Sequence, residues 1–370
     1  MTIIAGLEIN NYSFLISDTL ITNKSNDVDS YEYNAIPTLG DVSNFVTQDD
    51  YNILGLLTKI EIINDHFVIS WAGDVFKAKV IIKKIKMEFR NRIPTHQEIF
   101  DCIDEANCVQ FIWIIKNDSG LELRGYNAKE NHGKKYFDKS VVAGTNDSIV
   151  EEADDIFKSK SKSITIDDVV ADSACTALFM FSHLMNHEML MKDKANTLND
   201  KFGGYYDLVI FYDNKFQRLN EVTFIFLDAN TNDSGIIIIN GSGSIIKQCL
   251  NNEEIIVNKI NFEAIEGLGD EVLLSKITYN ESFSIQSTLN SSDFIAKNSF
   301  SSPFVCVITR CDSSIGHHCL INKYETSEIA EQKTIKITCI RKLLKLEFNQ
   351  DFFKSYESEL MSFYNGKNNG

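Results

Sequence analysis

The chain has 370 residues, which is longer than one typical domain. Its composition, 44% hydrophobic and 24% charged, is that of an ordinary globular protein. Its net charge of −16 would repel a phosphate backbone, so we expect no nucleic-acid partner. Apolar runs such as residues 236–239 are too short to span a bilayer, and Glu8 interrupts the first one, so we expect no membrane association or export but a cytoplasmic protein.

The chain begins Met1-Thr2-Ile3. Aminopeptidases remove a methionine that precedes a small side chain, so we expect the mature chain to begin at Thr2. That residue would then carry both a hydroxyl and a free α-amine. An α-amine titrates at about 7.7–8.0 in model peptides, so near neutrality part of it is unprotonated and can serve as base for the hydroxyl. Thr2 is therefore a candidate self-activated nucleophile.

Residues 2–22 read as two apolar strands separated by a turn at Asn10-Asn11, which is typical of a hairpin. Asp18 is expected near the end of the second strand.

After a polar insertion, residues 58–74 predict a second strand pair with its turn at Asn64-Asp65. Lys59 stands at its start and Gly73 at its end. A helix follows over residues 75–89, where apolar residues recur at helical spacing behind a candidate capping residue, Asp74.

These residues resemble a proteasome β-type subunit or its bacterial relative HslV, which are N-terminal nucleophile (Ntn) hydrolases. The matching parts are Thr2, the run Ser17-Asp18-Thr19-Leu20-Ile21-Thr22, Lys59-Ile60, and Gly73 at the head of a helix. The insertion of residues 23–58 places the lysine later than the family does, so its register rests on the Lys-Ile strand pattern.

Weaker matches extend the resemblance to about Arg218. Residues 141–155 look like the family's Gly-Ser-Gly segment, with Thr145 in place of the serine. Residues 199–216 look like its Asp-x-x-Ser-Gly-Gly loop and last strand, but no serine lies in this loop, and either Asp200 or Asn199 would fill the role of its aspartate.

The resemblance implies an α+β fold, a four-layer αββα sandwich, and a closed ring of identical subunits. It also implies a site. Thr2 would attack a peptide or protein substrate, Lys59 held by Asp18 would lower the pKa of the nucleophile, and Gly73 would bind the oxyanion. Thr22 would pair with the substrate backbone, and the remaining catalytic members would be Thr145 and Asp200.

We therefore predict a threonine peptidase or amidohydrolase that needs no cofactor. The alternative is a catalytically silent Ntn-like module that serves in assembly or partner binding. Taken singly, Asp18 is more often a turn residue and Lys59 more often a solvated strand end.

Metal binding is not expected. The eight cysteines follow no framework spacing, which is typical of reduced thiols. One short segment is rich in candidate zinc ligands but has no Cys-x-x-Cys pair: Cys306, Cys311, His317, His318 and Cys319. His183 and His187 share a face of a helix predicted over residues 173–195, without the glutamate of a His-Glu-x-x-His motif.

Two segments invite a phosphate-binding interpretation. Residues 240–247 are rich in glycine and serine but lack the Gly-Lys-Ser/Thr ending of a phosphate loop, so we predict a hairpin or a loop between strands. The second segment, residues 77–86, is rich in lysine and is the one candidate for a local basic patch. Lysines at this spacing are more typical of a solvated helix face, which is what we predict.

We expect domains at residues 1–219 and 220–370. The second contains short β-branched runs separated by turn residues, which predicts a mainly β domain, with a loop over residues 282–302 and a terminal helix over residues 350–364. Its role stays open between substrate delivery, oligomer assembly and docking of a partner protein.

Overall fold

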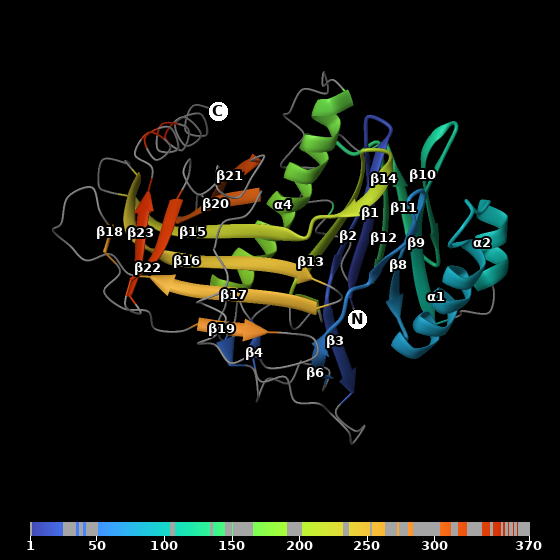
Figure 1. Cartoon of the computed structure of the whole chain (residues 1–370), viewed down its shortest axis with the longest axis horizontal. Coiled ribbons are helices and arrows are strands. Elements are labelled where there is room, and N and C mark those ends of the chain that lie inside the picture. Colours follow the sequence, from blue (N-terminus) through green and yellow to red (C-terminus); the bar gives the residue numbers. More distant parts are fainter. Residues whose placement is uncertain are drawn as a thin grey trace. The chain divides into compact units, whose positions relative to one another are not determined.

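The computed structural model forms two compact units, Met1–Leu219 and Asn220–Gly370, and mixes α and β structure (Figure 1). It describes residues 2–24, 35–36, 40–41, 51–103, 108–133, 136–144, 150, 166–190, 202–231, 237–251, 254–262, 272–273, 280–283, 304–311, 317–323, 335–340 and 343–348, and single residues 351, 354, 358 and 361.

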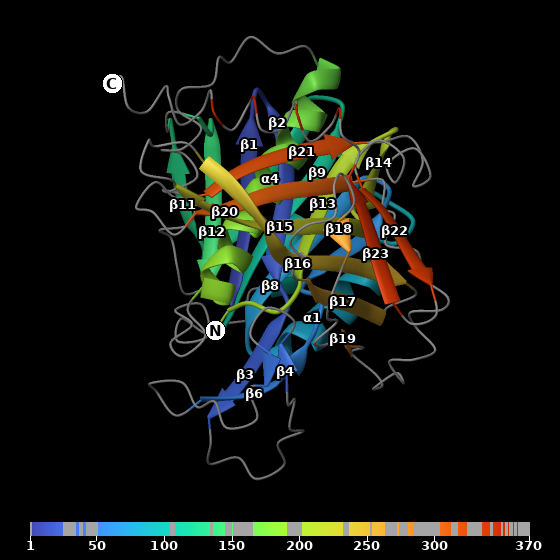
Figure 2. The ribbon, with the colours of Figure 1, turned by 90° about the vertical axis from the view of Figure 1, so that its left-hand side faces the viewer.

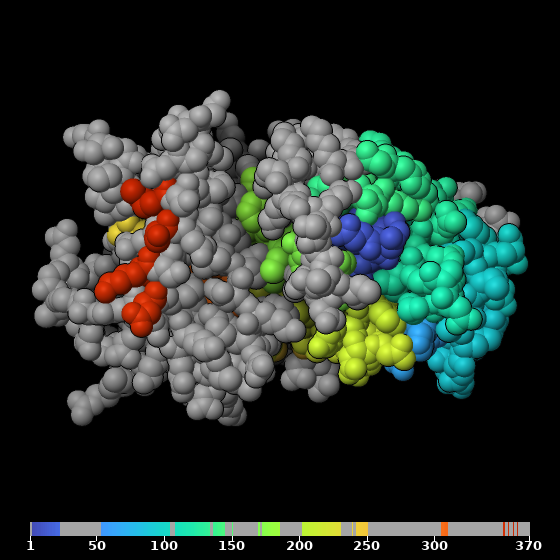
Figure 3. Space-filling model, turned by 90° about the horizontal axis from the view of Figure 1, so that it is seen from above, coloured from blue at the N-terminus to red at the C-terminus, as the bar shows by residue number. Residues whose placement is uncertain are grey.

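The first sheet of unit 1 is antiparallel, with the order β11-β12-β1-β2-β13-β14. Its strands are β1 (Ile3–Ile9), β2 (Tyr12–Asp18), β11 (Lys129–His132), β12 (Lys139–Gly144), β13 (Tyr206–Tyr212) and β14 (Lys215–Arg218). The predicted turn joins β1 to β2, with positive φ at Asn10 (50°) and Asn11 (62°), as a two-residue hairpin turn requires. In Figure 3 the blue atoms of this turn lie beside green and yellow atoms, the colours of β10–β12 and β13–β14.

The second sheet has the order β10-β9-β8-β7. Its strands are β7 (Ile60–Asn64), β8 (Phe67–Gly73), β9 (Val109–Asn117) and β10 (Gly120–Tyr126). The prediction of a turn at Asn64-Asp65 is wrong by one residue, because the turn is Asp65-His66. Asn64 stays in the strand because its side chain binds the carbonyls of Phe89 and Arg92 and accepts from the His66 N–H.

Helices cover the outer faces of both sheets. Between the sheets lies a core of twelve buried residues that includes Ile4, Val68 and Val209. On the far side of the second sheet, α1 (Val75–Phe89) and α2 (His96–Ile103) form a core with the outward side chains of β8 and β9, such as Trp113. On the opposite side, α4 (Ile166–Leu190) packs on β13 and β2 (Figure 1). The order of layers is helix, sheet, sheet, helices.

Helix α1 begins as the sequence predicts. Asp74 is its N-cap, and the Asp74 Oδ1 accepts the Lys77 N–H at 3.0 Å. Its buried residues are Ala78, Ile82, Ile85 and Phe89, and its lysines are exposed, as expected for a solvated face.

The predicted second strand, which was to run on to Thr22, divides at Thr19. The N–H groups of Thr19 and Leu20 donate to the Gly203 carbonyl, so the chain leaves the first sheet there. It continues as β3 (Leu20–Lys24), which pairs with β6 (Tyr51–Leu56) in a separate two-stranded sheet. The strands β4 (Ala35–Ile36) and β5 (Gly40–Asp41) form another small pair.

Helix α4 was predicted over residues 173–195 but spans Ile166–Leu190, so it begins seven residues earlier. Its buried side chains, among them Phe181, face the first sheet, and the Phe181 ring stacks on that of Tyr206. In the part of the chain that the structure describes, no helix is both long and apolar enough to cross a membrane.

From Glu221 on, the described residues of unit 2 form strands, apart from four helical residues near the C-terminus. The larger sheet has the order β19-β17-β16-β15-β20-β21, in which β15 and β20 run parallel (Figure 2). The smaller has the order β18-β23-β22. The strands are β15 (Glu221–Thr231), β16 (Ile237–Asn251), β17 (Glu254–Phe262), β18 (Val272–Leu273), β19 (Asn280–Phe283), β20 (Phe304–Cys311), β21 (His317–Lys323), β22 (Ile335–Ile340) and β23 (Leu343–Phe348).

The prediction of a hairpin or loop over residues 240–247 is wrong. This segment is the middle of β16, and residues 243–247 pair with both β15 and β17. Tertiary pairing on both sides overrides the turn preference of glycine and serine. The four helical residues near the C-terminus are Asp351, Lys354, Ser358 and Met361, while most apolar residues of the predicted terminal helix and most of the predicted loop over residues 282–302 lie outside the described residues.

Candidate functional site

Three predicted site residues meet in one buried network. The Lys59 Nζ lies 2.7 Å from the Asp18 Oδ1, and it also donates to the Thr2 Oγ. The Thr2 hydroxyl in turn donates to the Asp18 Oδ1. Thr2 directly precedes β1, Asp18 ends β2, and Lys59 directly precedes β7, so both sheets contribute.

The Asp18 carboxylate is fixed by backbone donors as well. Its Oδ1 accepts the Ile3 N–H at 3.0 Å, and its Oδ2 accepts the N–H groups of Leu20 at 3.2 Å and Gly203 at 3.0 Å. These donors hold the carboxylate in one orientation. Asp18 is thus a rigid counterion for Lys59.

Lys59 is held at its ammonium and its backbone. The ammonium donates to the Leu20 carbonyl at 2.7 Å, and the Lys59 carbonyl accepts the Trp71 N–H at 3.0 Å. Burial lowers the pKa of the ammonium, and the negative charge of Asp18 counteracts part of that change. Lys59 is thus fixed with its ammonium beside the Thr2 hydroxyl.

Two glycines shape the backbone near the network. Gly144 pairs with Ile3 and has φ +105°, and a Cβ there would lie 1.6 Å from the Thr2 carbonyl oxygen. Gly73, the predicted oxyanion residue, ends β8 just before α1 with φ +103°, and a Cβ there would lie 2.4 Å from the Cys108 carbonyl oxygen. Neither position accepts a side chain without a backbone shift.

The remaining predicted residues are Thr22, Thr145 and Asp200, with Asn199 as the alternative to Asp200. Thr22 lies in β3 opposite Ile53 of β6, in the small sheet that leaves the site. Thr145, Asp200 and Asn199 lie outside the described residues. Gly144, next to Thr145, and Gly203, near Asp200, do contact the Thr2 and Asp18 strands.

Sequence reasoning did not assign a role to Gly203, although its N–H binds Asp18 and its carbonyl accepts from Thr19 and Leu20. The signal was present, because a Gly-Gly pair directly before a strand marks unusual backbone geometry. It also missed the buried ion pair of Asp207 and Arg218, for which no local pattern exists.

A cavity of about 290 Å³ adjoins the strand that carries Lys59. Leu57 and Thr58, which directly precede Lys59, lie on one side, and Trp71, whose N–H binds the Lys59 carbonyl, also lines it. The other lining residues are Glu61, Lys79, Ile82, Lys83 and Lys86. Of these, Lys86 forms an ion pair with Glu61, with 2.7 Å between the Lys86 Nζ and the Glu61 Oε2.

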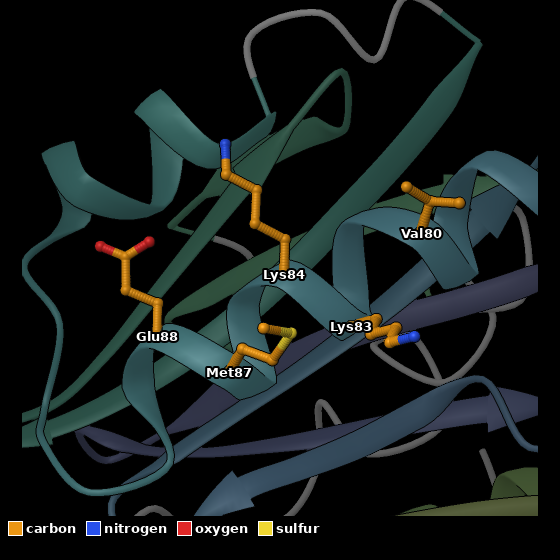
Figure 4. Close-up of a pocket in the computed structure, with 5 residues that line it drawn as sticks. All are labelled: Val80, Lys83, Lys84, Met87 and Glu88. Carbon is orange, nitrogen blue, oxygen red and sulfur yellow. The ribbon is translucent and has the colours of Figure 1, made fainter.

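A second hollow lies on the outer side of α1. Its lining residues all belong to that helix, and Lys84 and Glu88 extend toward the same side (Figure 4). Val80 and Met87 are exposed in it, at 55% and 73%. Neither hollow is lined by a member of the Thr2 network, but the first is lined by Leu57 and Thr58, which directly precede Lys59.

In the part of the chain that the structure describes, no three His, Cys, Asp or Glu side chains gather as a metal ion would require. The side chains of Cys311, His317, His318, Cys319 and His187 lie outside that part.

No protein-family model matches the chain, and no curated protein matches it. Among solved structures, the fold is similar to the Anbu (Gly-1) mutant from Hyphomicrobium sp. strain MC1, with a TM-score of 0.35 and 14% sequence identity, over 59% of this chain and 84% of that chain. The roles of individual residues in this chain therefore rest on its own geometry.

Proposed function

We propose that this chain is an Ntn hydrolase, a threonine peptidase or amidohydrolase whose nucleophile is Thr2 after removal of Met1. The observation that carries the proposal is the buried network of the Thr2 hydroxyl, the Lys59 ammonium and the Asp18 carboxylate. The layering of helix, sheet, sheet and helices supports an αββα sandwich around it.

In the proposed reaction the Thr2 Oγ attacks the carbonyl carbon of a peptide or amide. The α-amine of Thr2 accepts the hydroxyl proton and later donates it to the departing amine, leaving an ester between the substrate acyl group and Thr2. Water then hydrolyses this ester and regenerates the hydroxyl. Because nucleophile and base belong to one residue, little entropy is lost in orienting them.

Lys59 would tune this nucleophile. A positive charge within hydrogen-bond reach of the Thr2 Oγ lowers the pKa of the hydroxyl and of the adjacent amine. Asp18 keeps the ammonium in place and balances its charge.

The backbone after β8 would stabilise the oxyanion. Gly73 directly precedes the N-cap of α1, where N–H groups without helical partners and the helix dipole favour negative charge. One such donor contributes about 2.7–4 kcal/mol where it has been removed from other enzymes. Thr145 and Asp200 complete the proposed site, and Thr22 stays the proposed contact for the substrate backbone.

We propose that the cavity beside Lys59 holds the substrate side chain next to the cleaved bond. Its lining includes Trp71, while Lys79 and Lys83 add positive charge that Glu61 does not balance, since Glu61 already pairs with Lys86. Charge complementarity then favours an acidic side chain.

For assembly, we propose a homo-oligomeric ring of this chain, with unit 2 as the surface for a partner protein. Light scattering of the purified protein measures its molar mass directly. A monomer at all concentrations would contradict the ring.

A peptide epoxyketone tests the nucleophile, since this reagent forms bonds with both the hydroxyl and the α-amine of an N-terminal threonine. We expect intact-mass spectrometry to show loss of Met1 and one added inhibitor on Thr2. Thr2→Ser should keep labelling, because it retains a hydroxyl and a small side chain. Thr2→Ala should abolish it.

A homogeneous mass that retains Met1, or no labelling of the processed protein, would instead favour the silent module. Equal labelling of Thr2→Ala would show that a different residue reacts.

A further inference from the structure

An ion pair between Asp207 and Arg218 lies on the first sheet, and Arg218 also reaches the second sheet at Ile60, the residue after Lys59. Asp207 lies on β13 opposite Ser17, the neighbour of Asp18, and is fully buried. The Arg218 Nε, on β14, lies 2.9 Å and 3.1 Å from the two Asp207 carboxylate oxygens. The guanidinium then crosses to the second sheet, where its Nη2 donates to the Ile60 carbonyl.

The residues of this pair face the space between the sheets. Val209 and Phe216, each two positions away from one member, belong to the core there, and side chains two apart share a face of a strand. Burial raises the pKa of the Asp207 carboxyl, and the Arg218 charge counteracts part of that rise. Asp207 is fully buried and Arg218 is 18% exposed, so this is a mostly buried pair of the first sheet, and the bond from Arg218 to the Ile60 carbonyl is its contact with the second sheet.

The Ile60 carbonyl needs this donor. β7 is an edge strand of its sheet, and the preceding carbonyl, that of Lys59, already points to β8, where it accepts from Trp71. Successive carbonyls of a strand point in opposite directions, so the Ile60 carbonyl points to the open edge. Arg218 thus fixes the peptide that follows Lys59 from the sheet that carries Thr2 and Asp18.

We propose that Asp207 and Arg218 form a positioning pair that sets the place of the Lys59 ammonium relative to Thr2 and Asp18. The consequence for reactivity rests on the proposed function, but the placement of Lys59 does not. A second link, from the Phe216 N–H to the Asp65 carbonyl at 2.8 Å, joins the same elements without Arg218 and helps a variant to fold.

The experiment uses the full chain with ¹³Cε-labelled lysine, and the Lys59 signal is assigned by its absence in Lys59→Arg. In Arg218→Met we expect the NMR titration midpoint of Lys59 to move up toward the ordinary lysine value of about 10.4, because the ammonium leaves its buried place. Asp207→Asn should move it the same way. Arg92→Met, which removes an exposed arginine that pairs with Glu98, should leave it unchanged.

Epoxyketone labelling is measured on the same proteins across pH. We expect Arg218→Met to react about 10- to 100-fold more slowly, as for a displacement of about 1 Å, and Arg218→Lys to recover part of the rate. The pH midpoint of labelling should also rise, because the α-amine of Thr2 loses a nearby positive charge. A pair with only a structural role would lower stability without moving either midpoint.

Folded Arg218→Met and Asp207→Asn proteins with unchanged Lys59 midpoints would overturn the proposal. Where Arg218→Met does not fold, Arg218→Gln and Arg218→Lys are compared, and unchanged midpoints in both overturn it equally. If wild type is never labelled but the Lys59 midpoint still moves, the proposed function fails and the positioning pair stands.

Discussion

The Lys59 Nζ lies 2.7 Å from the Asp18 Oδ1, and each side chain is at most 1% exposed. Lys59 introduces the edge strand of one sheet, while Asp18 ends a central strand of the other. The pair therefore joins the sheets at the point where the Thr2 hydroxyl lies, so the proposed chemistry and the stability of the fold depend on the same contact.

Lys59→Met should lower the free energy of unfolding. Removing one partner leaves Asp18 buried without its counterion, which costs about 3 kcal/mol, the lower end for a buried pair, because backbone N–H groups still bind the carboxylate. Urea denaturation measures the change. The double variant Asp18→Asn/Lys59→Met should lose less than the sum of both single variants, and a loss equal to that sum would contradict a coupled pair.

Gly144→Ala should suppress labelling of Thr2. A methyl group there would lie 1.6 Å from the Thr2 carbonyl oxygen, so the segment that carries the proposed nucleophile must move. Gly133→Ala is the matched control, because Gly133 also has a positive φ, +65°, but a Cβ there meets nothing within 4 Å. Both variants carry a backbone strain of about 1–3 kcal/mol, so a labelling defect shared by both would disprove the contact argument.

Substrates with an acidic side chain next to the cleaved bond should be preferred. Lys79→Glu should lower kcat/KM for such peptides about two- to fivefold, since an exposed charge pair contributes about 0.2–1 kcal/mol, and added salt should reduce the difference. Lys84→Glu makes the same change on the outer hollow of α1 and should have little effect (Figure 4). A preference for basic side chains would refute this assignment of the cavity.

Glu122 should contribute stability that is lost in acid. Hydrogen bonds from Asn117, and then from His96 and Ser119, lower its pKa to about 2. A carboxyl with a lowered folded-state pKa stabilises fully above its unfolded pKa of about 4.3, and that stability is lost as the pH falls toward 2. The free energy of unfolding of Glu122→Gln should fall less steeply than that of wild type across this window, and parallel curves would exclude the effect.

Local chemistry made several parts of unit 1 predictable from sequence. The turn at Asn10-Asn11 follows from residues that tolerate positive φ, and the start of α1 follows from Asp74 before an apolar periodicity. The proximity of Lys59 to Thr2 and Asp18 was also expected, because these residues resemble the motifs that converge in Ntn hydrolases.

Other features depended on pairing partners outside the short segment in which the prediction was made. The exit of the strand at Thr19 is set by the Gly203 carbonyl, and residues 240–247 are a strand because β15 and β17 flank them. Whether a peptide group joins a β-sheet depends on which other strand supplies its hydrogen-bond partner. A short stretch of sequence does not contain that strand.

The sequence by itself identified the residues proposed to do the chemistry: a second-position threonine, an aspartate at a strand end, and a lysine before another strand. Only the tertiary structure decided that Asp18 is held by backbone N–H groups of distant segments and that Arg218 reaches the carbonyl after Lys59. The physical reason is that side-chain type and periodicity are local properties, whereas hydrogen-bond partners and burial arise only when the two sheets pack together.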